Sequence, residues 1–286
     1  MNKLPVAKRA QILSLLCEGS SMRSISRLAD VSINTVSGLL VRAGRVCAEF
    51  HDETVRGVKS RRVQVDEILS FTYAKQKNVE TAKSAPSDAG DTWTWTALDA
   101  DSKLIISWLV GARDRVYANA FMNDVSERLA NRVQLTSDGH RPYLQAVEDA
   151  FGSEVDYEVL QKLYGTDPLN ETRNSPAKCI GVKCETITGD PDPKHISTSY
   201  IERQNLTMRM HMRRFTRLTN AFSKKFDNHV AMVALYTVWY NFVRVHKTLR
   251  VTPAMQAGLA DHVWEMAEVV ALIEESEMLV PAAHAN

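Results

Sequence analysis

The sequence contains few cysteines, and they are not placed to form a metal site or a disulfide framework. Cys17, Cys47, Cys179 and Cys184 include no Cys-x-x-Cys pair, and no histidine-rich tract lies beside them. Scattered thiols in a chain of this length are typical of reduced, mostly buried cysteines in a cytosolic protein. We therefore expect neither a zinc-stabilised domain nor a secreted, disulfide-bonded one.

Long hydrophobic runs are also absent. No apolar stretch approaches the roughly 18 residues that a membrane-spanning helix needs. The N-terminus lacks the charged and then apolar order of a signal sequence. We therefore expect a chain that neither crosses a membrane nor is secreted.

The net charge is only +1, but the charge is unevenly distributed along the chain. Residues 1–62 carry 11 basic and 5 acidic side chains, and residues 203–250 carry 10 and 1. Residues 63–202 carry 14 basic and 22 acidic side chains, and residues 251–286 carry 6 acidic ones and no Lys or Arg. Basic segments on both sides of an acidic one suggest that the flanks contact a polyanion while the central carboxylates serve another purpose.

Residues 6–44 have the pattern of three short helices, and Gly19 and Gly44 are predicted to end the first and the third. Ser32 is suited to cap the third helix. The residues expected to point inward from the second and third helices are Met22, Ile25, Leu28, Ile33, Val36, Leu39 and Leu40. Two short helices joined by a turn of three or four residues are typical of a helix-turn-helix unit.

Such a unit would bind double-stranded DNA, with its second helix in the major groove. The outward polar residues expected to contact base edges are Asn34, Thr35 and Ser37. The arginines placed for phosphate contacts are Arg23, Arg27, Arg42 and Arg45. The alternative is a small helical bundle that serves dimerisation. The positive charge and the outward polar residues favour DNA binding.

After a polar and basic linker or connecting helix over residues 46–61, the hydrophobic pattern changes to period two, which is typical of strands. The predicted strands are 61–71, two within 91–111 that are joined by a turn at Asp99–Lys103, 132–140 and 155–165. Helices are predicted over 115–131 and 141–152. The residues of the first of these that are available for burial are Val116, Ala120, Val125 and Leu129. This order predicts an α/β fold, a mixed sheet with helices packed on it.

The rest of the chain, from residue 165 onward, is predicted to be a loop followed by helices. Residues 165–196 are rich in Gly, Pro, Asp and Asn and read as a long mobile loop, which in a compact domain tends to be functional. The chain is helical again from Ser199 to about Val245. A distinct acidic helix over residues 254–276 closes it.

Three carboxylates occur where a sheet could bring them to one site. Asp66 lies within the first predicted strand, where an ionised group is costly unless it is paired or bound to a cation. Asp138 ends the fourth strand, at the edge where open α/β sheets bind ligands. Glu202 begins the helix after the loop. Mg²⁺ and Mn²⁺ prefer such an all-oxygen ligand set, and two ions about 4 Å apart can promote phosphoryl transfer.

Each carboxylate also has a structural explanation. Asp66 could be an edge-strand charge, and the adjacent Glu67 is equally eligible as a ligand. Asp138 could belong to a turn. Glu202 could form a capping box with Ser199, in which both side chains accept hydrogen bonds from backbone N–H groups at the helix start.

The segments VQVDEI, LTSDGH and YIERQN resemble the three acidic motifs of the DDE transposases and integrases of bacterial insertion sequences. Asp66 and Asp138 are 72 residues apart, and Asp138 and Glu202 are 64 apart, which is compatible with the ribonuclease-H-like fold of that family. The basic stretch after Glu202 and the closing segment WYNFVRVHKTLRVTPAM resemble the shorter members, of the insertion-sequence-one type. Those members also begin with a helix-turn-helix.

The sequence departs from the family pattern at two places. Arg244-Val245-His246 stands where the family has Arg-Pro-His, and Gly139-His140 follows the second acidic motif, a position where families vary. Neither departure changes a carboxylate.

The resemblance implies that Asp66, Asp138 and Glu202 are the catalytic residues and the ligands of two Mg²⁺ or Mn²⁺ ions. Metal-activated water would cut one strand at each transposon end, and the freed 3′-OH would attack target DNA without a covalent protein–DNA intermediate. The implied partners are double-stranded DNA, as terminal inverted repeats and target, and further copies of the chain in a homodimer or larger synaptic assembly. No membrane and no small-molecule substrate is expected. The implied location is the cytoplasm of a bacterium or archaeon, in association with the nucleoid.

Helical spacing from Glu202 places Asn205 and Arg209 within reach of the scissile phosphates. The residues expected to contact the DNA backbone beyond them are Arg213, Arg214, Arg217, Lys224 and Lys225. Lys194 and His195 are weaker candidates. His246 is either functional or simply packed.

The expected domains are a helix-turn-helix over residues 1–45, the linker 46–61, a ribonuclease-H-like catalytic domain over 62–250 and the acidic helix in 251–286. The rival hypothesis is a non-catalytic helix-turn-helix regulator of DNA with a degenerate ribonuclease-H-like domain. A further alternative is a relic protein that retains the carboxylates but no longer has partner DNA.

Overall fold

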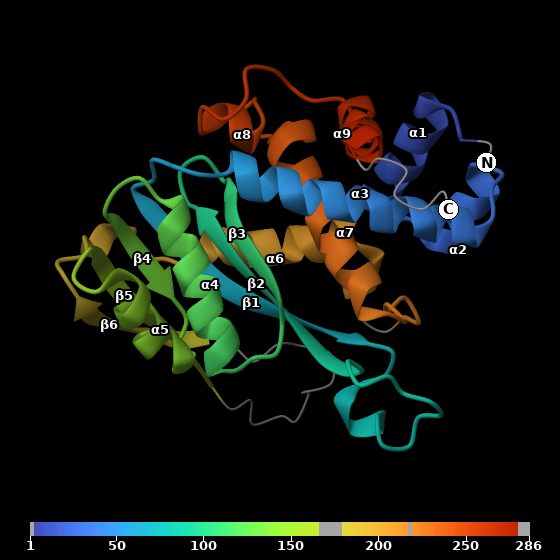
Figure 1. The fold of residues 1–286 in the computed structure, drawn as a ribbon. Helices are drawn as coiled ribbons and strands as arrows, with labels where there is room; N and C mark the ends of the chain where they lie inside the picture. The colour runs from blue at the N-terminus through green and yellow to red at the C-terminus, as the bar shows by residue number, and fades with distance from the viewer. Residues whose placement is uncertain (1–2, 166–178, 217–218, 280–286) are drawn as a thin grey trace.

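The computed structural model describes residues 3–165, 179–216 and 219–279 (Figure 1). Three N-terminal helices are followed by a six-stranded sheet and then by further helices. A single cluster of buried hydrophobic residues extends through all three parts. Within the described residues, no helix is both long and apolar enough to cross a membrane.

The three predicted N-terminal helices are present as α1 (Val6–Cys17), α2 (Met22–Leu28) and α3 (Ile33–Thr54). The side chains of Ser21 and Ser32 accept hydrogen bonds from backbone N–H groups at the starts of α2 and α3 and so cap both helices. Gly19 turns the chain after α1 with a φ of +72°, and a Cβ there would stand 2.7 Å from the Met210 carbonyl oxygen. The turn therefore needs glycine both for its backbone conformation and for its close approach to the rest of the protein.

The prediction that the third helix ends at Gly44 is wrong. α3 continues for 22 residues to Thr54, so a helix occupies most of the segment expected as a linker or connecting helix. Gly44 is buried in the middle of α3, where a Cβ would stand 2.4 Å from the Ala231 Cα of α7 (Phe226–Val238). The glycine marks a close contact between two helices and not a helix end.

Two residues predicted to point inward are exposed instead. Leu28 is 65% exposed and Ile33 is 43% exposed. α2 has seven residues, of which Ile25 is fully buried and Met22 packs against the core partly buried. The end of α2 and the start of α3 therefore project from the protein, which leaves Asn34 exposed as well.

The sheet contains the predicted strands and one more. Their bounds are β1 (Arg62–Thr72), β2 (Gly90–Asp99), β3 (Ile105–Gly111), β4 (Val133–Ser137), β5 (Val155–Tyr164) and β6 (Cys179–Thr188). The order across the sheet is β3-β2-β1-β4-β5-β6. The pairs β1–β2, β2–β3 and β5–β6 are antiparallel, and β1–β4 and β4–β5 are parallel. The predicted fold class is confirmed as α/β: the chain has a mixed sheet with flanking helices, preceded by helices.

β6 overturns part of the predicted loop over residues 165–196. It pairs with β5 from Tyr157 to Tyr164 and forms the edge of the sheet. Its side chains are mostly exposed, so it shows no alternation of buried and exposed residues that sequence could reveal. Residues 166–178 of the predicted loop lie outside the described residues.

Helices cover both faces of the sheet (Figure 1). α4 (Arg115–Arg128) and α5 (Pro142–Phe151) lie on one face, where Trp95 of β2 contacts Phe121 and Tyr143. α6 (Ser199–His211) lies on the other, where Thr96, the next residue of β2, faces Met208. Adjacent strand residues point to opposite faces, and this alternation decides which side chains can meet at the site.

The burial pattern predicted for α4 is only partly correct. Val125 is buried as expected, but Val116 is 75% exposed and Ala120 is also exposed. Phe121 and Met122 are fully buried instead. The larger apolar pair determines which face of the helix meets the sheet.

The predicted continuous helix from Ser199 to about Val245 is interrupted. α6 ends at His211, a short 3₁₀ turn follows at Arg213–Phe215, and α7 begins only at Phe226. A π-helical turn, Trp239–Val243, continues α7. Within that turn the amide of Asn241 bonds both backbone groups of Ile105, at 3.0 Å to its N–H and 2.9 Å to its carbonyl. The Tyr-Asn of the closing motif therefore attaches this turn to β3.

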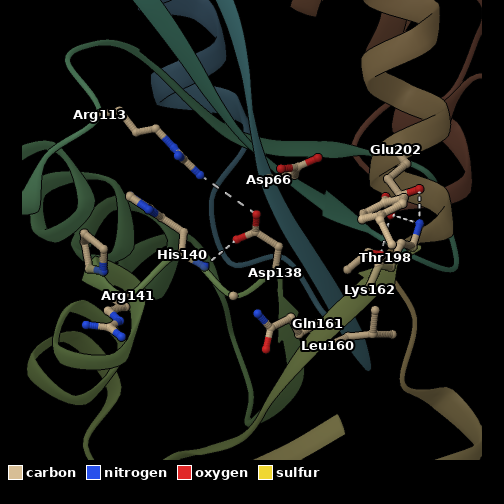
Figure 2. A pocket seen from close by; sticks show the side chains of 13 residues that line it. Asp66, Arg113, Asp138, His140, Arg141, Leu160, Gln161, Lys162, Thr198 and Glu202 are labelled. Carbon is tan, nitrogen blue, oxygen red and sulfur yellow. Dashed lines mark hydrogen bonds and ion pairs between the residues drawn. The ribbon is translucent and has the colours of Figure 1, made fainter. Parts of the chain in front are cut away.

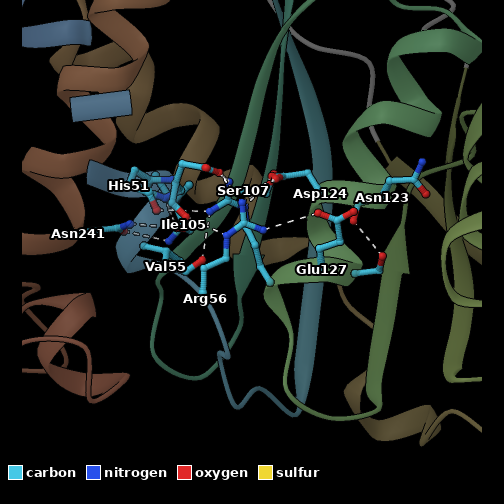
Figure 3. A network of polar contacts seen from close by, with 12 residues as sticks. His51, Val55, Arg56, Ile105, Ser107, Asn123, Asp124, Glu127 and Asn241 are labelled. Carbon is cyan, nitrogen blue, oxygen red and sulfur yellow. Dashed lines mark hydrogen bonds and ion pairs between the residues drawn. The ribbon is translucent and has the colours of Figure 1, made fainter. Parts of the chain in front are cut away.

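A buried polar network joins the end of α3 to the sheet and to α4 (Figure 3). His51 donates to the Ile105 carbonyl, and burial is the largest cause that lowers the pKa of His51 to about 4. Arg128, which is 4% exposed, donates to the carbonyls of His51 and Val55 and pairs with Asp52 and Asp124. These bonds fix the end of α3 relative to the sheet.

The predicted single tail helix is two helices, α8 (Pro253–Gln256) and α9 (Met266–Leu279), with a non-helical connection. α9 packs on α1 and α3. Its Glu274 pairs with the buried Arg9 at 2.5 Å, and its Glu277 lies 3.6 Å from Arg42. The acidic end of the chain therefore neutralises part of the basic N-terminal region.

Candidate active site

One face of the sheet brings together polar side chains from three neighbouring strands. Asp66 of β1 points to the face covered by α6, as the buried Gln64 two residues earlier does. Asp138 follows the last residue of β4, and Lys162 lies near the end of β5. Glu202 lies in the first turn of α6, over the same face. These elements surround a cleft of about 710 Å³.

Figure 2 shows this cleft, with the three predicted carboxylates and the basic side chains among its walls. The residues that line it are Asp66, Arg113, Asp138, Gly139, His140, Arg141, Pro142, Leu160, Gln161, Lys162, Tyr164, Thr198 and Glu202. Residues 66, 138 and 202, which are far apart in the sequence, thus share one cavity.

Asp66 is held from two sides. Its Oδ1 accepts from the Glu67 backbone N–H at 2.8 Å, and its Oδ2 accepts from Asn205 Nδ2 at 2.8 Å. Burial is the largest cause that raises the pKa of Asp66, followed by the carboxylates of Glu67 and Asp138, and together they raise it to about 7. Crowding of carboxylates is what a bound cation would relieve.

Glu67 points into the protein, toward α4 and α5. Arg113 contacts its Oε1 at 2.5 Å, and the Tyr143 hydroxyl donates to its Oε2 at 2.9 Å. Its side chain is 1% exposed, and burial, followed by the Asp138 charge, raises the pKa of Glu67. Both oxygens are thus engaged by protein groups. Of the two adjacent acids in the first motif, Asp66 has the more accessible position for a ligand.

Asp138 lies at the open end of the cleft. Its Oδ1 accepts from the His140 backbone N–H at 2.9 Å, and Arg113 lies 4.0 Å from its Oδ2. Burial and then Arg113 lower the pKa of His140, so its ring is neutral at neutral pH. The side chain of Asp138 is 40% exposed and thus accessible from solvent.

Glu202 does not form the capping box predicted with Ser199. α6 begins at Ser199 itself, and Thr198 precedes it as the cap residue. The Thr198 hydroxyl donates to Glu202 Oε1 at 2.6 Å, and Lys162 Nζ lies 2.5 Å from each Glu202 oxygen. The carboxylate is therefore turned toward β5.

The donor set fits a hard divalent cation. Oxygen atoms of Asp66, Glu67 and Asp138 lie within 4.8 Å of one another, and Glu202 is outside this group. The buried Asn205 Oδ1, beside Asp66, has no hydrogen-bond partner among the described residues. Carboxylate and amide oxygens are the ligands that Mg²⁺ and Mn²⁺ prefer.

The helix-turn-helix candidates have different environments. Asn34 is exposed, and Thr35 bonds to Ser32 at the helix cap. Ser37 is half-buried and accepts from Asn228 of α7 at 3.3 Å. Arg42 is half-exposed and faces α9.

The basic segment after Glu202 also divides into two groups. Arg213, Lys224 and Lys225 are exposed. Asn205 contacts Asp66, and Arg209 Nη1 donates to the Phe215 carbonyl at 3.5 Å. Arg214 donates to Ser223 at 2.6 Å, and burial lowers the pKa of Arg214 to about 10, so this arginine points inward. Arg217 lies outside the described residues.

The other two candidate histidines, His195 and His246, lie outside the cleft. His195 is exposed and contacts Arg62 through Nδ1 at 2.9 Å. The backbone of His246 closes a turn by donating to the Val251 carbonyl and accepting from Arg250, and Nδ1 of its ring is buried. Neither lines the cleft. Lys194 is exposed in the short turn before α6.

Four residues of the site were not predicted from the sequence: Arg113, Tyr143, Lys162 and Thr198. Each of them contacts one of the acidic residues. Lys162 and Thr198 had a weak signal, since a strand end and a helix cap are positions where side chains reach a sheet edge. Arg113 and Tyr143 had none, because Arg113 lies in the connection after β3 and Tyr143 on α5, whereas their partner Glu67 lies on β1.

Comparison with known proteins gives similarity of structure but not of sequence. No protein-family model matches the chain, and no curated protein matches it. The piggyBac transposase, in a synaptic complex with hairpin DNA, is similar with a TM-score of 0.41 and 9% identity over 98% of this chain and 73% of that one. The Mos1 transposase, in a paired-end complex with the left transposon end, is similar with a TM-score of 0.29 and 14% identity over 92% and 82%. A second paired-end complex, of the Mos1 mariner with Mn, has a TM-score of 0.28 and 14% identity over 83% of this chain and 78% of that one.

Proposed function

We propose that this protein is a DDE transposase that cleaves DNA strands at transposon ends and joins the 3′-OH ends to target DNA. One observation carries the proposal. Asp66, Asp138 and Glu202, which belong to three separate sequence motifs, line the same cleft at the end of the parallel strands. A regulator has no need of three acids there, whereas phosphoryl transfer does.

Asp66 and Asp138, with Glu202 once it turns from Lys162, would hold two Mg²⁺ or Mn²⁺ ions. When bound, the ions supply Lewis-acid chemistry at the scissile phosphate. Asn205 orients Asp66 through its 2.8 Å hydrogen bond, and the His140 N–H orients Asp138. Arg113 anchors Glu67 and adds positive charge at the phosphate side of Asp138.

Beyond the cleft, cations along and after α6 would bind the DNA backbone. Arg213, Lys224 and Lys225, which are exposed, follow α6, and Arg209, which is half-buried on α6 itself, lies one helical turn beyond Asn205. The start of α3, with Asn34 and Thr35, would contact bases. Arg214 is assigned a structural role, and Arg42 and Ser37 lie against α9 and α7.

The proposal extends to assembly and location. Two transposon ends must be held together for strand transfer, so we expect a homodimer or larger synaptic assembly on double-stranded DNA. The element would belong to the insertion sequences of a bacterium or archaeon, and the protein would act at the nucleoid in the cytoplasm.

The test is metal-dependent nicking of a duplex that carries the inverted repeat flanking the coding sequence. Wild-type protein should nick this duplex with Mg²⁺ or Mn²⁺ and not with EDTA. Asp66→Asn, Asp138→Asn and Glu202→Gln should each lower the rate by at least about 10²-fold, the cost of removing a group that acts at the reacting phosphate. Glu53→Gln, an exposed acid on α3 away from the cleft, is the control. Nicking that survives Glu202→Gln would contradict the three-carboxylate site.

A second candidate is a non-catalytic DNA-binding regulator. It is favoured by one observation, the pairing of Glu202 with Lys162, which leaves the third carboxylate turned from the other two. In that case DNA binding would be unchanged in Asp66→Asn, and no divalent cation would bind to the wild type.

A further inference from the structure

Lys162 and Glu202 form a tight ion pair inside the cleft. Nζ of Lys162 lies 2.5 Å from both oxygens of Glu202, so the lysine spans the carboxylate symmetrically. Lys162 belongs to β5 and Glu202 to α6, and the two residues are 40 positions apart in the sequence. The Thr198 hydroxyl donates to Oε1 as well, so three contacts hold this side chain.

These contacts have a consequence for the other carboxylates. Asp66 and Asp138 have oxygens within 4.8 Å of each other, together with Glu67, but Glu202 is not in that group (Figure 2). A positive charge already neutralises Glu202. The three carboxylates therefore line one cleft, but the oxygens of Glu202 do not lie close to those of the other two.

The ion pair is in a position where it can be exchanged. The side chain of Lys162 is 31% exposed and that of Glu202 is 41% exposed, so water and salt screen their attraction. Arg113, another cation of the cleft, is instead committed to the buried Glu67. Arg141, which is exposed, also lines the cleft, but Lys162 is the cation that pairs with Glu202, so a phosphate that draws Lys162 away would release this carboxylate.

On this basis we propose that Lys162 is a positioning residue that couples DNA binding to completion of the metal site. Without DNA, Lys162 occupies Glu202 and holds it away from Asp66 and Asp138. A DNA phosphate in the cleft takes over Lys162 and releases Glu202 toward the cation. The inference rests on the proposed function and goes beyond it, since it assigns a residue outside the acidic motifs and makes metal and DNA binding mutually dependent.

The first test measures Mn²⁺ binding to the DNA-free full chain by titration calorimetry at pH 8. Lys162→Met should bind Mn²⁺ about two- to fivefold more tightly than wild type, the range expected for release of an exposed ion pair. Lys183→Met is the matched control, because Lys183 forms an exposed pair with Glu185 on the adjacent strand β6. In Lys162→Met combined with Glu202→Gln the gain should disappear.

The second test measures the affinity for a labelled duplex by fluorescence anisotropy, with EDTA and with Mg²⁺, and the duplex is checked on a gel after each titration. Lys162→Met should match the wild type in EDTA, because Lys162 is then bound to Glu202. With Mg²⁺ it should bind DNA more weakly, and its salt dependence should fall by about one phosphate contact. Lys162→Arg should restore most of the Mg²⁺-dependent affinity.

Two results would overturn the inference. One is Mn²⁺ affinity in Lys162→Met that is equal to or weaker than in the wild type, in protein whose melting temperature is unchanged. The other is an equal loss of DNA affinity with and without Mg²⁺, which would make Lys162 an ordinary phosphate contact. Failure of the proposed function looks different, because then Mn²⁺ binding would not depend on Asp66 and Asp138 in any variant.

Discussion

Gly44 of α3 lies directly against Ala231 of α7, so closely that a Cβ on Gly44 would stand 2.4 Å from both the Cα and the Cβ of Ala231. α3 and α7 make the most extensive contact between any two helices among the described residues. The packing of the N-terminal region on the rest of the protein therefore requires a residue without a side chain at position 44.

Gly44→Ala should lower the free energy of unfolding by up to about 2 kcal/mol, because an overpacking cost of about 1–3 kcal/mol is only partly offset by the helix-propensity gain of about 1 kcal/mol. Gly38→Ala, in the same helix, is the control: its Cβ would meet only Arg42 Nη1, at 3.9 Å. That variant should gain up to about 1 kcal/mol. Urea titration followed by circular dichroism measures both, and equal effects of the two substitutions would argue against the close contact.

Arg128→Met should destabilise the protein by about 2–4 kcal/mol. The substitution leaves the carbonyls of His51 and Val55 and the carboxylate of Asp124 without their buried donor. Arg115→Met, at the exposed start of the same helix, should change stability by less than about 0.5 kcal/mol. Thermal melts of the two variants side by side would show whether the contacts of Arg128 with the end of α3 contribute this stability.

Asp66→Asn should stabilise the metal-free protein at alkaline pH. The pKa of Asp66 is raised to about 7 in the folded state, above the usual value of 3.8, so the folded protein prefers the protonated form. The stability contributed by this group is present below pH 3.8 and is lost as the pH rises to about 7. Since asparagine has no charge to bury, the variant should gain about 1–3 kcal/mol at pH 8 and much less at pH 4.

The measurement is a series of chemical denaturations between pH 4 and pH 8, with EDTA present. Glu53→Gln, at an exposed acid away from the cleft, serves again as the control. A gain at pH 8 that does not shrink on acidification would have a cause other than the ionisation of Asp66.

The exposed and the inward cations after α6 should behave differently. Replacing Arg213, Lys224 or Lys225 with Gln should weaken DNA binding and reduce the slope of log affinity against log salt by about 0.9 for each phosphate that is no longer neutralised, with an unchanged melting temperature. Arg214→Gln should lower the melting temperature, because the half-buried Arg214 would lose its hydrogen bond to the buried Ser223. Anisotropy over a range of salt concentrations, together with thermal melts, would separate the two groups.

The strands of this fold could be predicted from the sequence because β1 to β5 have one or both faces buried. Apolar residues recur there at period two or in short runs. β6 could not be predicted in this way, since almost all its side chains are exposed at the sheet edge. Gly44 shows a second limit: the same residue type is typical of a helix end and of a close helix contact, and only the partner at Ala231 distinguishes them.

The candidate site shows the same division. The positions of Asp66, Asp138 and Glu202 could be predicted, because a strand interior, a strand end and a helix start each constrain where a carboxylate lies. Whether Asp66 or Glu67 faces the cleft depended on Arg113 and Tyr143, which come from other parts of the chain. The orientation of Glu202 depended on Lys162, and the pairing of these two residues could not be predicted from the position of Lys162 in a strand.

α6 carries Glu202 in its first turn and ends at His211, whose Nδ1 donates to the Cys17 carbonyl of α1 at 3.0 Å. A helix of 13 residues is about 20 Å long and bends little over that length, so its two ends move together. Displacement of α1 by a ligand would therefore displace Glu202 as well. One continuous helix that packs on the sheet therefore links the N-terminal helices to the third carboxylate.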